Sequence, residues 1–453
     1  MKTRNNGASV LSRNQSRRGA ALVIVMGISL CLVTIALFFC DSMLVEYRAS
    51  DYGMEGEQAQ QAISGAARYI KYVLDNSETP GYLPGEDTFE YEEVMIEDAA
   101  FWLIGRDYEE SFPDEDPVFG LISESGKLNI NTANSEMLES LPGITSEMAA
   151  AIIDWRDPDS ETTTGGAESD YYLLLDEGYN AKNGPFESIE ELRLVRDCNM
   201  EILFGEDVNV NGVLDPYEND GDENYPPDNA DGVLDCGLAE YLTVFSREPN
   251  KRDDGSERIN IQTQRDELNR FLEETFGGER SQQMMSALGD NPQNMKSVLE
   301  FYIRARLTPE EFLRIHDALT VAEGEYIEGL VNINTASEQV LICVPGIDDE
   351  SARLIVSSRQ DKTSEERQSL AWIAGVLEAS SCIEAGPHLT TRTYQFRLDV
   401  AALGRNGHGY RRDLMIMDTS EDNANVIYRK NLQRQGWALG KKVREEFPES
   451  GDE

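Results

Sequence analysis

Residues 207–218 carry oxygen donors at the spacing of a twelve-residue EF-hand calcium loop. Side-chain oxygens stand at positions 1, 3, 5, 9 and 12, a backbone carbonyl is available at position 7, and the glycine at position 6 permits the sharp turn. The predicted ligands are Asp207, Asn209, Asn211, Val213, Asp215 and Glu218. Because a hard cation takes six to eight oxygen ligands, the pattern predicts Ca²⁺ as a cofactor.

The core of this loop recurs further along the same segment. Asn229, Asp231 and Asp235 repeat positions 3, 5 and 9, whereas Pro227 and Leu238 stand at positions 1 and 12. A second ion would therefore need ligands from elsewhere. The candidates for these borrowed ligands are Asp228, Asp220 and Asp222.

Acidic residues dominate the chain. Its 453 residues include 84 Asp and Glu against 40 Lys and Arg, a net charge of -44. The alternative to calcium binding is a solvated, disordered acidic segment, because residues 206–240 hold eleven acids and no Lys or Arg. Nucleic-acid affinity rests mainly on Lys and Arg, so no nucleic-acid partner is expected.

The sequence holds only three His and no Gly-rich phosphate loop or Gly-x-Ser-x-Gly elbow, so we do not expect an enzyme.

The sequence at the N-terminus predicts a membrane anchor, to which the rest of the chain is attached. Ala20–Cys40 is 21 residues without a charge, about 31 Å as a helix, which matches a bilayer core. The basic residues that precede it are Lys2, Arg4, Arg13, Arg17 and Arg18. They place the N-terminus in the cytoplasm and the bulk of the chain outside. A plain anchor is one interpretation; a secretory signal is disfavoured, because Phe39 to Asp41 is unlike a cleavage site.

A second interpretation of this segment depends on Gly19. Arg-Arg-Gly followed at once by an apolar helix resembles a type IV prepilin leader. In that family a prepilin peptidase cuts after the glycine, which makes Gly19 and Ala20 the implied processing site. Ile24 stands at the fifth mature position, where most such proteins carry Glu and the K-type minor pseudopilins typically do not. An apolar stripe over residues 41–77 predicts that the helix continues beneath a sheet.

Two segments match each other at a constant offset of 203 residues. Leu128–Ala133 corresponds to Val331–Ala336, and each is followed by a Pro-Gly turn and an apolar helix. The pattern predicts two helix-hairpin-helix units, with Thr132 and Thr335 as helix caps. The turn residues are Pro142, Gly143, Pro345 and Gly346.

Helix-hairpin-helix units often hold a DNA phosphate through turn N–H groups and nearby Lys or Arg. Here Glu147 follows the first turn, and Asp348, Asp349 and Glu350 follow the second. These carboxylates would repel a phosphate, so an interaction role is favoured over DNA binding. A third, decayed copy begins at Arg258 and lacks the Pro-Gly.

The C-terminal part predicts strands. Alternating apolar residues over 394–400 indicate one strand, Arg411–Met417 its return strand, and residues 119–130 an earlier hairpin. With the leader and the two Asn-Ile-Asn-Thr-Ala repeats, the chain resembles the general secretion pathway protein K family. The resemblance implies an α+β fold with a long N-terminal membrane helix and a pseudopilin-type antiparallel sheet. It also implies a large helical insert with two helix-hairpin-helix (SAM-like) subdomains, here carrying the EF-hand-like calcium loop.

The expected domain organisation follows from these segments. A leader (1–19), a transmembrane part (20–40) and an external continuation of the helix (41–77) come first. The remaining segments are the first pseudopilin strands (78–127), the first helix-hairpin-helix subdomain (128–205), the acidic calcium insert (206–240), a strand with the degenerate repeat (241–329), the second helix-hairpin-helix subdomain (330–387), the C-terminal strands (388–420) and a tail (421–453).

The resemblance implies a minor pseudopilin of a type II secretion system, placed at the pseudopilus tip, that helps to initiate fibre assembly and protein export. Its implied partners are two further minor pseudopilins, the inner-membrane secretion platform and the prepilin peptidase. It would cross the inner membrane once, with its N-terminus in the cytoplasm and its bulk in the periplasm. The alternatives are a membrane-anchored DNA-uptake protein and a calcium-dependent membrane-anchored adhesin.

Four cysteines lie outside the membrane segment. In an oxidising compartment they could form two disulfides, Cys198–Cys236 at the ends of the calcium insert and Cys343–Cys382 in the second subdomain. The alternative is four buried thiols.

Overall fold

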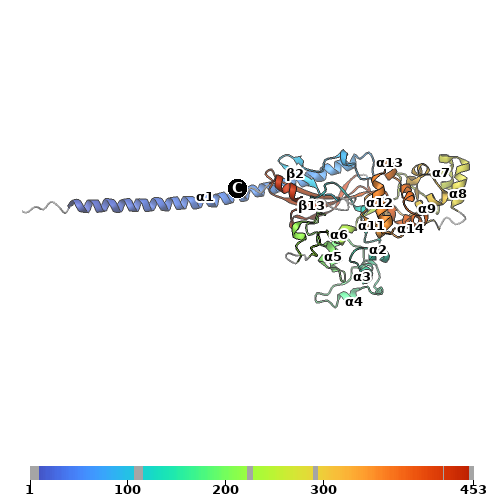
Figure 1. Cartoon of the computed structure of the whole chain (residues 1–453), viewed down its shortest axis with the longest axis horizontal. Helices are drawn as coiled ribbons and strands as arrows, with labels where there is room; N and C mark the ends of the chain where they lie inside the picture. The colour runs from blue at the N-terminus through green and yellow to red at the C-terminus, as the bar shows by residue number, and fades with distance from the viewer. Residues whose placement is uncertain (1–9, 107–115, 222–227, 289–293, 422, 448–453) are drawn as a thin grey trace, which may run out of the picture.

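A long helix dominates the shape of the molecule. The computed structural model describes residues 10–106, 116–221, 228–288, 294–421 and 423–447. Within it α1 (Val10–Asp75) is a continuous helix of 66 residues that projects from the body as a rod (Figure 1). From residue 21 onward the outer part of the rod is exposed and apolar, and it is long enough to cross a membrane. These features support a single-pass membrane anchor at the N-terminus.

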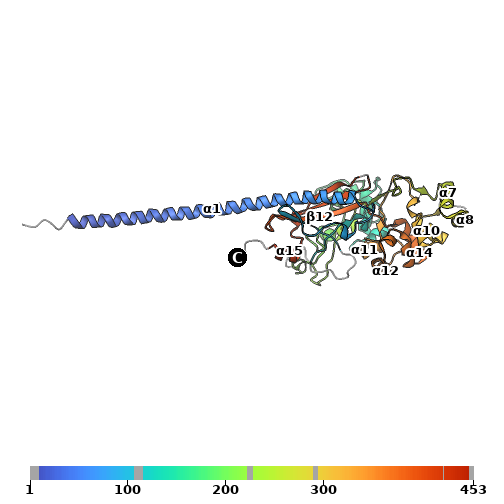
Figure 2. The same cartoon turned by 90° about the horizontal axis from the view of Figure 1, so that it is seen from above.

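The inner end of α1 lies on an antiparallel sheet (Figure 2). The strand order is β1-β2-β12-β13-β14, and β3 also pairs with β12. Leu398 faces Met415 across β12 and β13, which confirms the predicted strand and its return strand. The strands are β1 (Val94–Ile96), β2 (Ala99–Leu103), β3 (Ile122–Ser123), β12 (Gln395–Leu403), β13 (Arg411–Asp418) and β14 (Asn425–Asn431).

Alternation along the strands gives the sheet two buried faces. Phe101 and Leu398 point to the face that packs against Ile63 and Ile70 of α1. Trp102 points to the other face, which packs against α15 (Gly440–Glu446) and the segment before it. The predicted stripe on the external part of α1 is therefore covered by the sheet, as the sequence indicated.

A large helical head is inserted between β3 and β12, and it contains three copies of one unit: the two expected and the decayed copy that begins at Arg258. Each unit opens and closes with two-residue strands that pair in parallel: β4 (Leu128–Asn129) with β5 (Leu242–Thr243), β7 (Ile259–Asn260) with β8 (Leu319–Thr320), and β10 (Val331–Asn332) with β11 (Leu389–Thr390). The same hydrogen bond follows each pair, from the N–H of an isoleucine to the carbonyl of the closing threonine. These bonds are Ile130 to Thr243 (2.9 Å), Ile261 to Thr320 (2.9 Å) and Ile333 to Thr390 (3.0 Å).

The units differ in their helices. The first contains α2 (Ser135–Glu139), α3 (Ser146–Arg156), α4 (Ser169–Tyr172), α5 (Met200–Phe204) and α6 (Leu238–Tyr241). The second contains α7 (Arg265–Phe276), α8 (Gly278–Ala287), α9 (Val298–Ala305) and α10 (Pro309–Leu313). The third contains α11 (Glu338–Ile342), α12 (Asp349–Gln360), α13 (Ser364–Arg367) and α14 (Ala379–Ala385). A separate antiparallel pair, β6 (Arg247–Pro249) with β9 (Tyr326–Glu328), frames the second unit.

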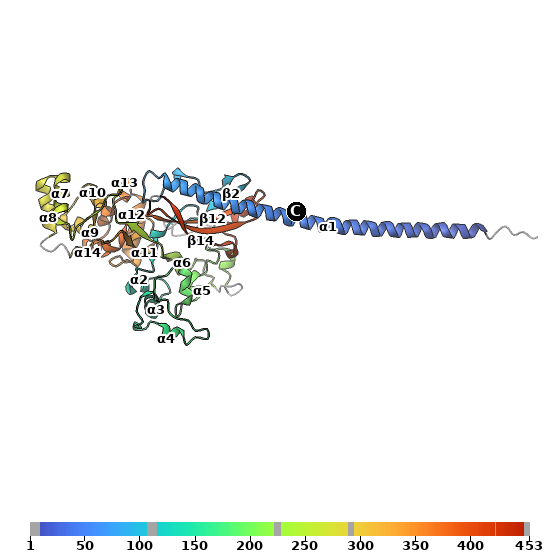
Figure 3. The same cartoon turned by 180° about the vertical axis from the view of Figure 1, so that it is seen from behind.

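The first unit lies to one side of the sheet, while the helices of the second and third lie at the end of the body farthest from the projecting rod (Figures 1 and 3). Short 3₁₀ helices complete the fold. They are η1 (Glu86–Thr88), η2 (Glu124–Gly126), η3 (Ile189–Leu194), η4 (Pro216–Glu218), η6 (His316–Ala318), η7 (Leu370–Gly375), η8 (Gly386–His388) and η9 (Gln433–Gln435).

Three sequence-based expectations are corrected by the fold. The hairpin expected over residues 119–130 does not form, because β3 pairs with β12 and β4 with the distant β5. The helix caps are Asn134 and Ser337, two residues beyond the predicted threonines. The segment expected to be a tail (421–453) contributes β14 and α15.

Candidate functional site

The first predicted calcium loop is closed by hydrogen bonds to its own carboxylates. Asp207 accepts from the backbone N–H groups of Asn211 (3.0 Å) and Gly212 (2.9 Å). Glu218, at the opposite end, accepts from the N–H groups of Val208 (2.9 Å) and Asp215 (3.0 Å). The carboxylates at positions 1 and 12 therefore hold the loop closed through hydrogen bonds to its backbone N–H groups.

The side chains at positions 3, 5 and 9 converge inside this loop. The amide Nδ2 of Asn209 lies 2.6 Å from Oδ2 of Asp215, and Nδ2 of Asn211 lies 3.3 Å from the same oxygen. Oδ1 of Asn209 is enclosed and has no hydrogen-bond partner, although the residue is fully buried. A cation bound here would satisfy this amide oxygen, whereas the Asp215 carboxylate already accepts from both amides.

The electrostatics of the loop favour a positive ion. Burial raises the pKa of Glu218 to about 8, with the nearby charges of Asp207 and Asp215 adding to the rise. Burial also raises the pKa of Asp207, although Arg106 opposes the shift. Two ionised carboxylates in a dry loop repel each other, and a bound divalent cation would reverse that repulsion.

Two arginines attach this loop to the sheet. Arg106, which follows β2, donates to the carbonyl oxygens of Val210 (3.1 Å) and Asn211 (3.2 Å). Arg412 of β13 donates to the carbonyl oxygens of Val210 (2.7 Å) and Asn209. These hydrogen bonds attach the loop backbone to the sheet.

The second loop has the same conformation as the first at the positions they share. Val233 donates its N–H to Oδ1 of Asp231 at 2.8 Å, as Val213 does to Asn211. Nδ2 of Asn229 lies 3.0 Å from Oδ2 of Asp235, which matches Asn209 and Asp215. The fourth and sixth positions have positive φ in both loops: Val210 (53°) and Gly212 (78°) in the first, Ala230 (52°) and Gly232 (79°) in the second.

Glu206 and Asn219, which sequence reasoning missed, stand where the second loop lacks ligands. Glu206 accepts from the N–H groups of Asn229 (3.2 Å) and Asp235 (3.2 Å), at positions 3 and 9, as Glu218 does in the first loop. Oδ1 of Asn219 accepts from the N–H of Gly232 at 3.2 Å, as Asp207 does from Gly212.

The sequence feature that could have indicated both residues as ligands is their position directly beside the first loop. Glu206 directly precedes its position 1, and Asn219 directly follows its position 12. Among the candidates named from sequence, Asp228 accepts from the N–H groups of Asp220, Gly221 and Ala230 and so stabilises the entry to the second loop. Asp222 and Pro227 lie outside the described residues.

The two hairpin turns have the geometry their glycines require. Gly143 has a φ of 75° and Gly346 a φ of 85°, in the left-handed region that other residues avoid. Thr145 caps α3 after the first turn, and Asp348 caps α12 after the second. The Asp348 carboxylate accepts from the N–H of Ser351 at 2.9 Å, so an acid already occupies the helix end that a phosphate would need.

All six cysteines are free thiols in the structure, so neither of the two suggested disulfides is formed. Cys198, Cys343 and Cys382 are buried within the core of the helical head. Burial raises the pKa of the Cys198 and Cys343 thiols to about 12 and that of Cys382 to about 11, which keeps all three protonated. Burial also raises the pKa of the half-buried Cys236.

The processing residues lie on the rod. Gly19 and Ala20 fall within α1, which begins at Val10, and residues 1–9 of the leader lie outside the described residues. Cleavage after Gly19 stays a prediction.

Comparison with known proteins bears on the first unit of the head. Residues 127–203 match the family described as "Type II secretion system (T2SS), protein K", a stretch that begins one residue before β4 and ends one residue before the end of α5. No curated protein matches the sequence significantly.

Among solved structures, a chain of the GspK-GspI-GspJ complex from the enterotoxigenic Escherichia coli type 2 secretion system aligns over 83% of this chain and 97% of its own length. Its sequence identity is 11% and its TM-score 0.37, too low to carry details of that complex over to this protein. The match over residues 127–203 confirms the resemblance to protein K of the type II secretion system that the sequence indicated.

Proposed function

We propose that this protein is a minor pseudopilin of a type II secretion system, and that it occupies the tip of the pseudopilus, where it helps to start fibre assembly and protein export. The observation that carries the proposal is the position of the head. The second and third helical units lie at the end of the body farthest from the rod, and the first unit projects sideways (Figures 1 and 3). In a fibre built from packed rods, a subunit stacked above this one would need the space that the head fills.

The rod supplies the assembly surface. From residue 21 to about residue 50 its side chains are exposed, and large apolar residues such as Leu30 and Phe38 recur along it. Exposed apolar surface of this extent needs lipid before assembly and other helices afterwards. We expect the same helix to sit in the inner membrane, with its N-terminus in the cytoplasm, and then to pack against two other minor pseudopilins. The inner-membrane secretion platform and the prepilin peptidase are its further partners in this proposal.

Calcium has a structural role in the proposal. The first loop would bind Ca²⁺ through Asp207, Asn209, Asn211, Asp215, Glu218 and the carbonyl of Val213. The second would use Asn229, Asp231, Asp235 and the carbonyl of Val233, completed by Glu206 and Asn219. The enclosed Oδ1 of Asn209 and the raised pKa of the Glu218 carboxyl support the first site. Ions here would fix the insert against the sheet through Arg106 and Arg412.

Labelling of the assembled fibre tests the tip position. An epitope inserted at the exposed turn around Gly255, on the head, leaves the rod and the sheet intact. In cells that produce the full set of pseudopilins, we expect one cluster of label at a single end of each fibre. Label spaced along the shaft would overturn the tip assignment, and a matched epitope on the major subunit provides the shaft control.

A further inference from the structure

A cleft of about 180 Å³ lies where the second helical unit meets the third. The second unit contributes Leu299 of α9 and Phe312 of α10, and the third contributes Leu389 of β11. These three side chains belong to the buried core of the head. Further apolar residues of the cleft are half-buried and line its opening: Val298, Val321, Ile327, Leu330, Leu370 and Pro387. The cleft therefore has an apolar floor and an apolar opening.

The charged residues that line the cleft neutralise one another. Nη1 of Arg258 lies 3.2 Å from Oε1 of Glu248, and Nη2 of Arg392 lies 2.8 Å from Oδ1 of Asp317. The hydroxyl of Thr390 donates to the other oxygen of Glu248 at 2.8 Å. Two positive and two negative side chains leave no net charge on this wall. We therefore expect the cleft to bind a neutral group rather than an ion.

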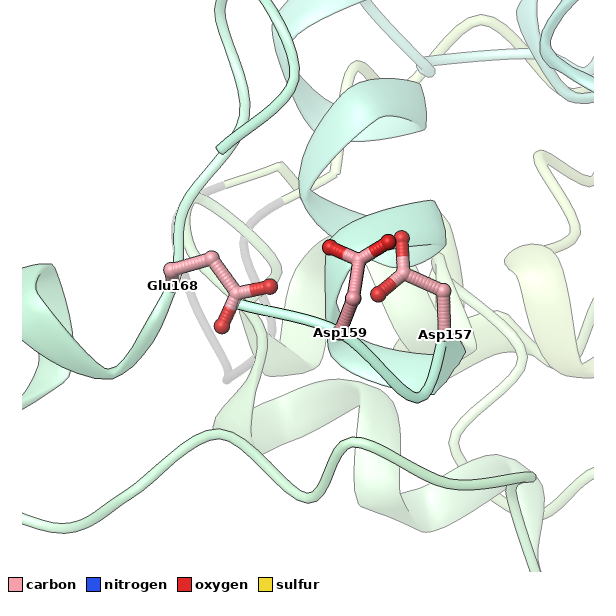
Figure 4. Close-up of side chains that lie close together, drawn as sticks. All are labelled: Asp157, Asp159 and Glu168. Atoms are coloured by element: carbon pink, nitrogen blue, oxygen red, sulfur yellow. The ribbon is translucent and has the colours of Figure 1, made fainter. Parts of the chain in front are cut away.

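The first helical unit shows the opposite arrangement of charge. Its Asp157, Asp159 and Glu168 each bring one carboxylate oxygen to within 4.8 Å of the others (Figure 4). Carboxylates that face one another in this way favour a cation. In the cleft between the second and third units each carboxylate has an arginine beside it instead. The ligand of this cleft must therefore be held by packing and by hydrogen bonds between neutral groups.

His316 offers the cleft an unused polar group. It lines the cleft, and its ring centroid lies 5.8 Å from that of Phe312. Among the residues that the structure describes, none forms a hydrogen bond with the ring nitrogens of His316. Burial is the largest cause that lowers the pKa of His316 to about 4, so its imidazole is neutral at pH 7. A neutral imidazole offers one N–H donor and one acceptor nitrogen.

The size and the walls of the cleft select an aromatic ring. A closed apolar cavity of about 150 Å³ holds benzene, so this cleft has room for one substituted ring. An aromatic ring can pack offset or edge-to-face against Phe312 and His316. A hydroxyl group on the ring can accept the imidazole N–H or donate to the other nitrogen. Tyrosine is the side chain that combines such a ring with a single hydroxyl.

A tyrosine within a protein chain fits this cleft better than the free amino acid does. Free tyrosine would bring an ammonium and a carboxylate to a wall whose own charges are already paired, and removing unpaired charges from water is costly. In a partner protein the backbone stays outside and only the ring enters, as aromatic anchors do at protein interfaces. We propose that the cleft between the second and third units binds a tyrosine side chain of a partner protein.

Two capped amino acids that differ by one hydroxyl test the proposal. N-acetyl-L-tyrosinamide and N-acetyl-L-phenylalaninamide are each titrated into the full chain in detergent micelles, and binding is followed by saturation-transfer NMR. We expect saturable binding of the tyrosine probe, about fivefold tighter than that of the phenylalanine probe, because the hydroxyl adds one hydrogen bond. Free tyrosine should bind more weakly than its capped form.

Three variants locate the bound probe. Val321→Phe fills the cleft with a larger side chain and should weaken binding of the tyrosine probe about tenfold. Val426→Phe makes the same change at an exposed position of β14 and should bind the probe as the wild type does. His316→Phe keeps a ring in place but removes both nitrogens, so it should bind the two capped probes equally. Thermal melts show whether each variant is folded, and His316→Phe tests the cleft independently of Val321→Phe.

A tyrosine probe that does not saturate on the wild type would overturn the proposal, as would unchanged binding to folded Val321→Phe. Equal affinity of the wild type for the two capped probes would overturn the choice of tyrosine and the part given to His316. None of these results bears on the tip position, which the labelled fibre tests by itself.

Discussion

Arg412 and Asp399 form an ion pair that is closed off from solvent: Nη2 lies 2.6 Å from Oδ2, and neither side chain is more than 1% exposed. The same guanidinium donates to the carbonyl oxygens of Asn209 and Val210 in the first predicted calcium loop. One side chain therefore links β12, β13 and the acidic insert. Because the loop backbone and the sheet share this arginine, order in one is coupled to order in the other.

Removal of Arg412 should be among the most damaging single changes in the sheet. Arg412→Ala leaves Asp399 buried and uncompensated, and we expect a loss of about 3–5 kcal/mol in the free energy of unfolding. Arg353→Ala removes an exposed ion pair with Glu338 and should cost less than about 1 kcal/mol. Thermal melts of both variants in detergent, followed by circular dichroism, make the comparison. Equal melting temperatures of the two variants would show that the buried Arg412–Asp399 pair stabilises the fold no more than the exposed Arg353–Glu338 pair does.

Chelation should destabilise the chain through the two loops. An ion that binds only the native state stabilises it by about 3 kcal/mol at a concentration a hundredfold above its Kd. Excess chelator should therefore lower the melting temperature of the wild type. Glu218→Gln should respond much less, and Glu206→Gln should lose part of the response because it affects the second loop.

The exposed-acid variant Glu177→Gln is the control and should respond as the wild type does. A wild-type melt that does not change in chelator would contradict the calcium assignment of these loops. An unchanged response in Glu206→Gln alone would contradict only the role given to that residue.

Local patterns in the sequence predicted much of this structure. The charge-free stretch, the alternation over 394–400 and the Pro-Gly turns each reflect physics that acts within about twenty residues, and the structure has the rod, β12 and two glycines at positive φ in those places. The ligand spacing that predicts the first calcium loop is equally local, because one continuous turn sets it, and the bound ion itself stays a prediction.

Features that depend on distant partners were not predictable. Leu128 pairs with Leu242, and the hydrophobic pattern near residue 128 gives no sign of a partner 114 residues away. The second unit was predicted only as a decayed copy, because Gly277 and Gly278 connect its helices in place of Pro-Gly. Glu206 was missed because its role becomes visible only when the second loop folds back beside the first, through the Gly205–Cys236 bridge.

Gly143 and Gly346 occupy the same position in the two hairpin turns, but their surroundings differ. A Cβ at Gly143 would meet no atom within 4 Å, whereas a Cβ at Gly346 would lie 3.0 Å from the Ser381 carbonyl oxygen and from Cβ of Glu384. Gly143→Ala should therefore cost about 1 kcal/mol, from its left-handed backbone alone. Gly346→Ala should cost clearly more, because α14 must also shift. Melting temperatures of the two variants test this order, and the reverse order would contradict the packing of α14 against the second turn.

His316 should make the chain less stable in acid. Burial, with a smaller contribution from the nearby charges of Arg392 and Arg258, lowers its pKa to about 4; Asp253 acts in the opposite direction. Between that value and the ordinary 6.5 the unfolded chain binds a proton that the folded chain does not. Stability is therefore lost as the pH falls from about 6.5 to 4.

His316→Gln should remove about 1–2 kcal/mol of that loss, measured as the difference between melts at pH 7 and pH 5. If the variant and the wild type lose the same stability over this range, the histidine is protonated in the folded state.

Processing of the leader decides whether the rod is a pseudopilin helix or a plain anchor. With the prepilin peptidase present, mass spectrometry of the purified chain should show the loss of residues 1–19 and a new N-terminus at Ala20. Gly19→Leu should block the cut, because the family resemblance requires a small residue before the cleaved bond. Gly27→Ala lies further along the rod, where a Cβ meets no atom within 4 Å, and should be processed normally. A wild-type chain that keeps its leader in cells with an active peptidase would leave the membrane-anchor interpretation standing and would remove the basis for assembly into a fibre.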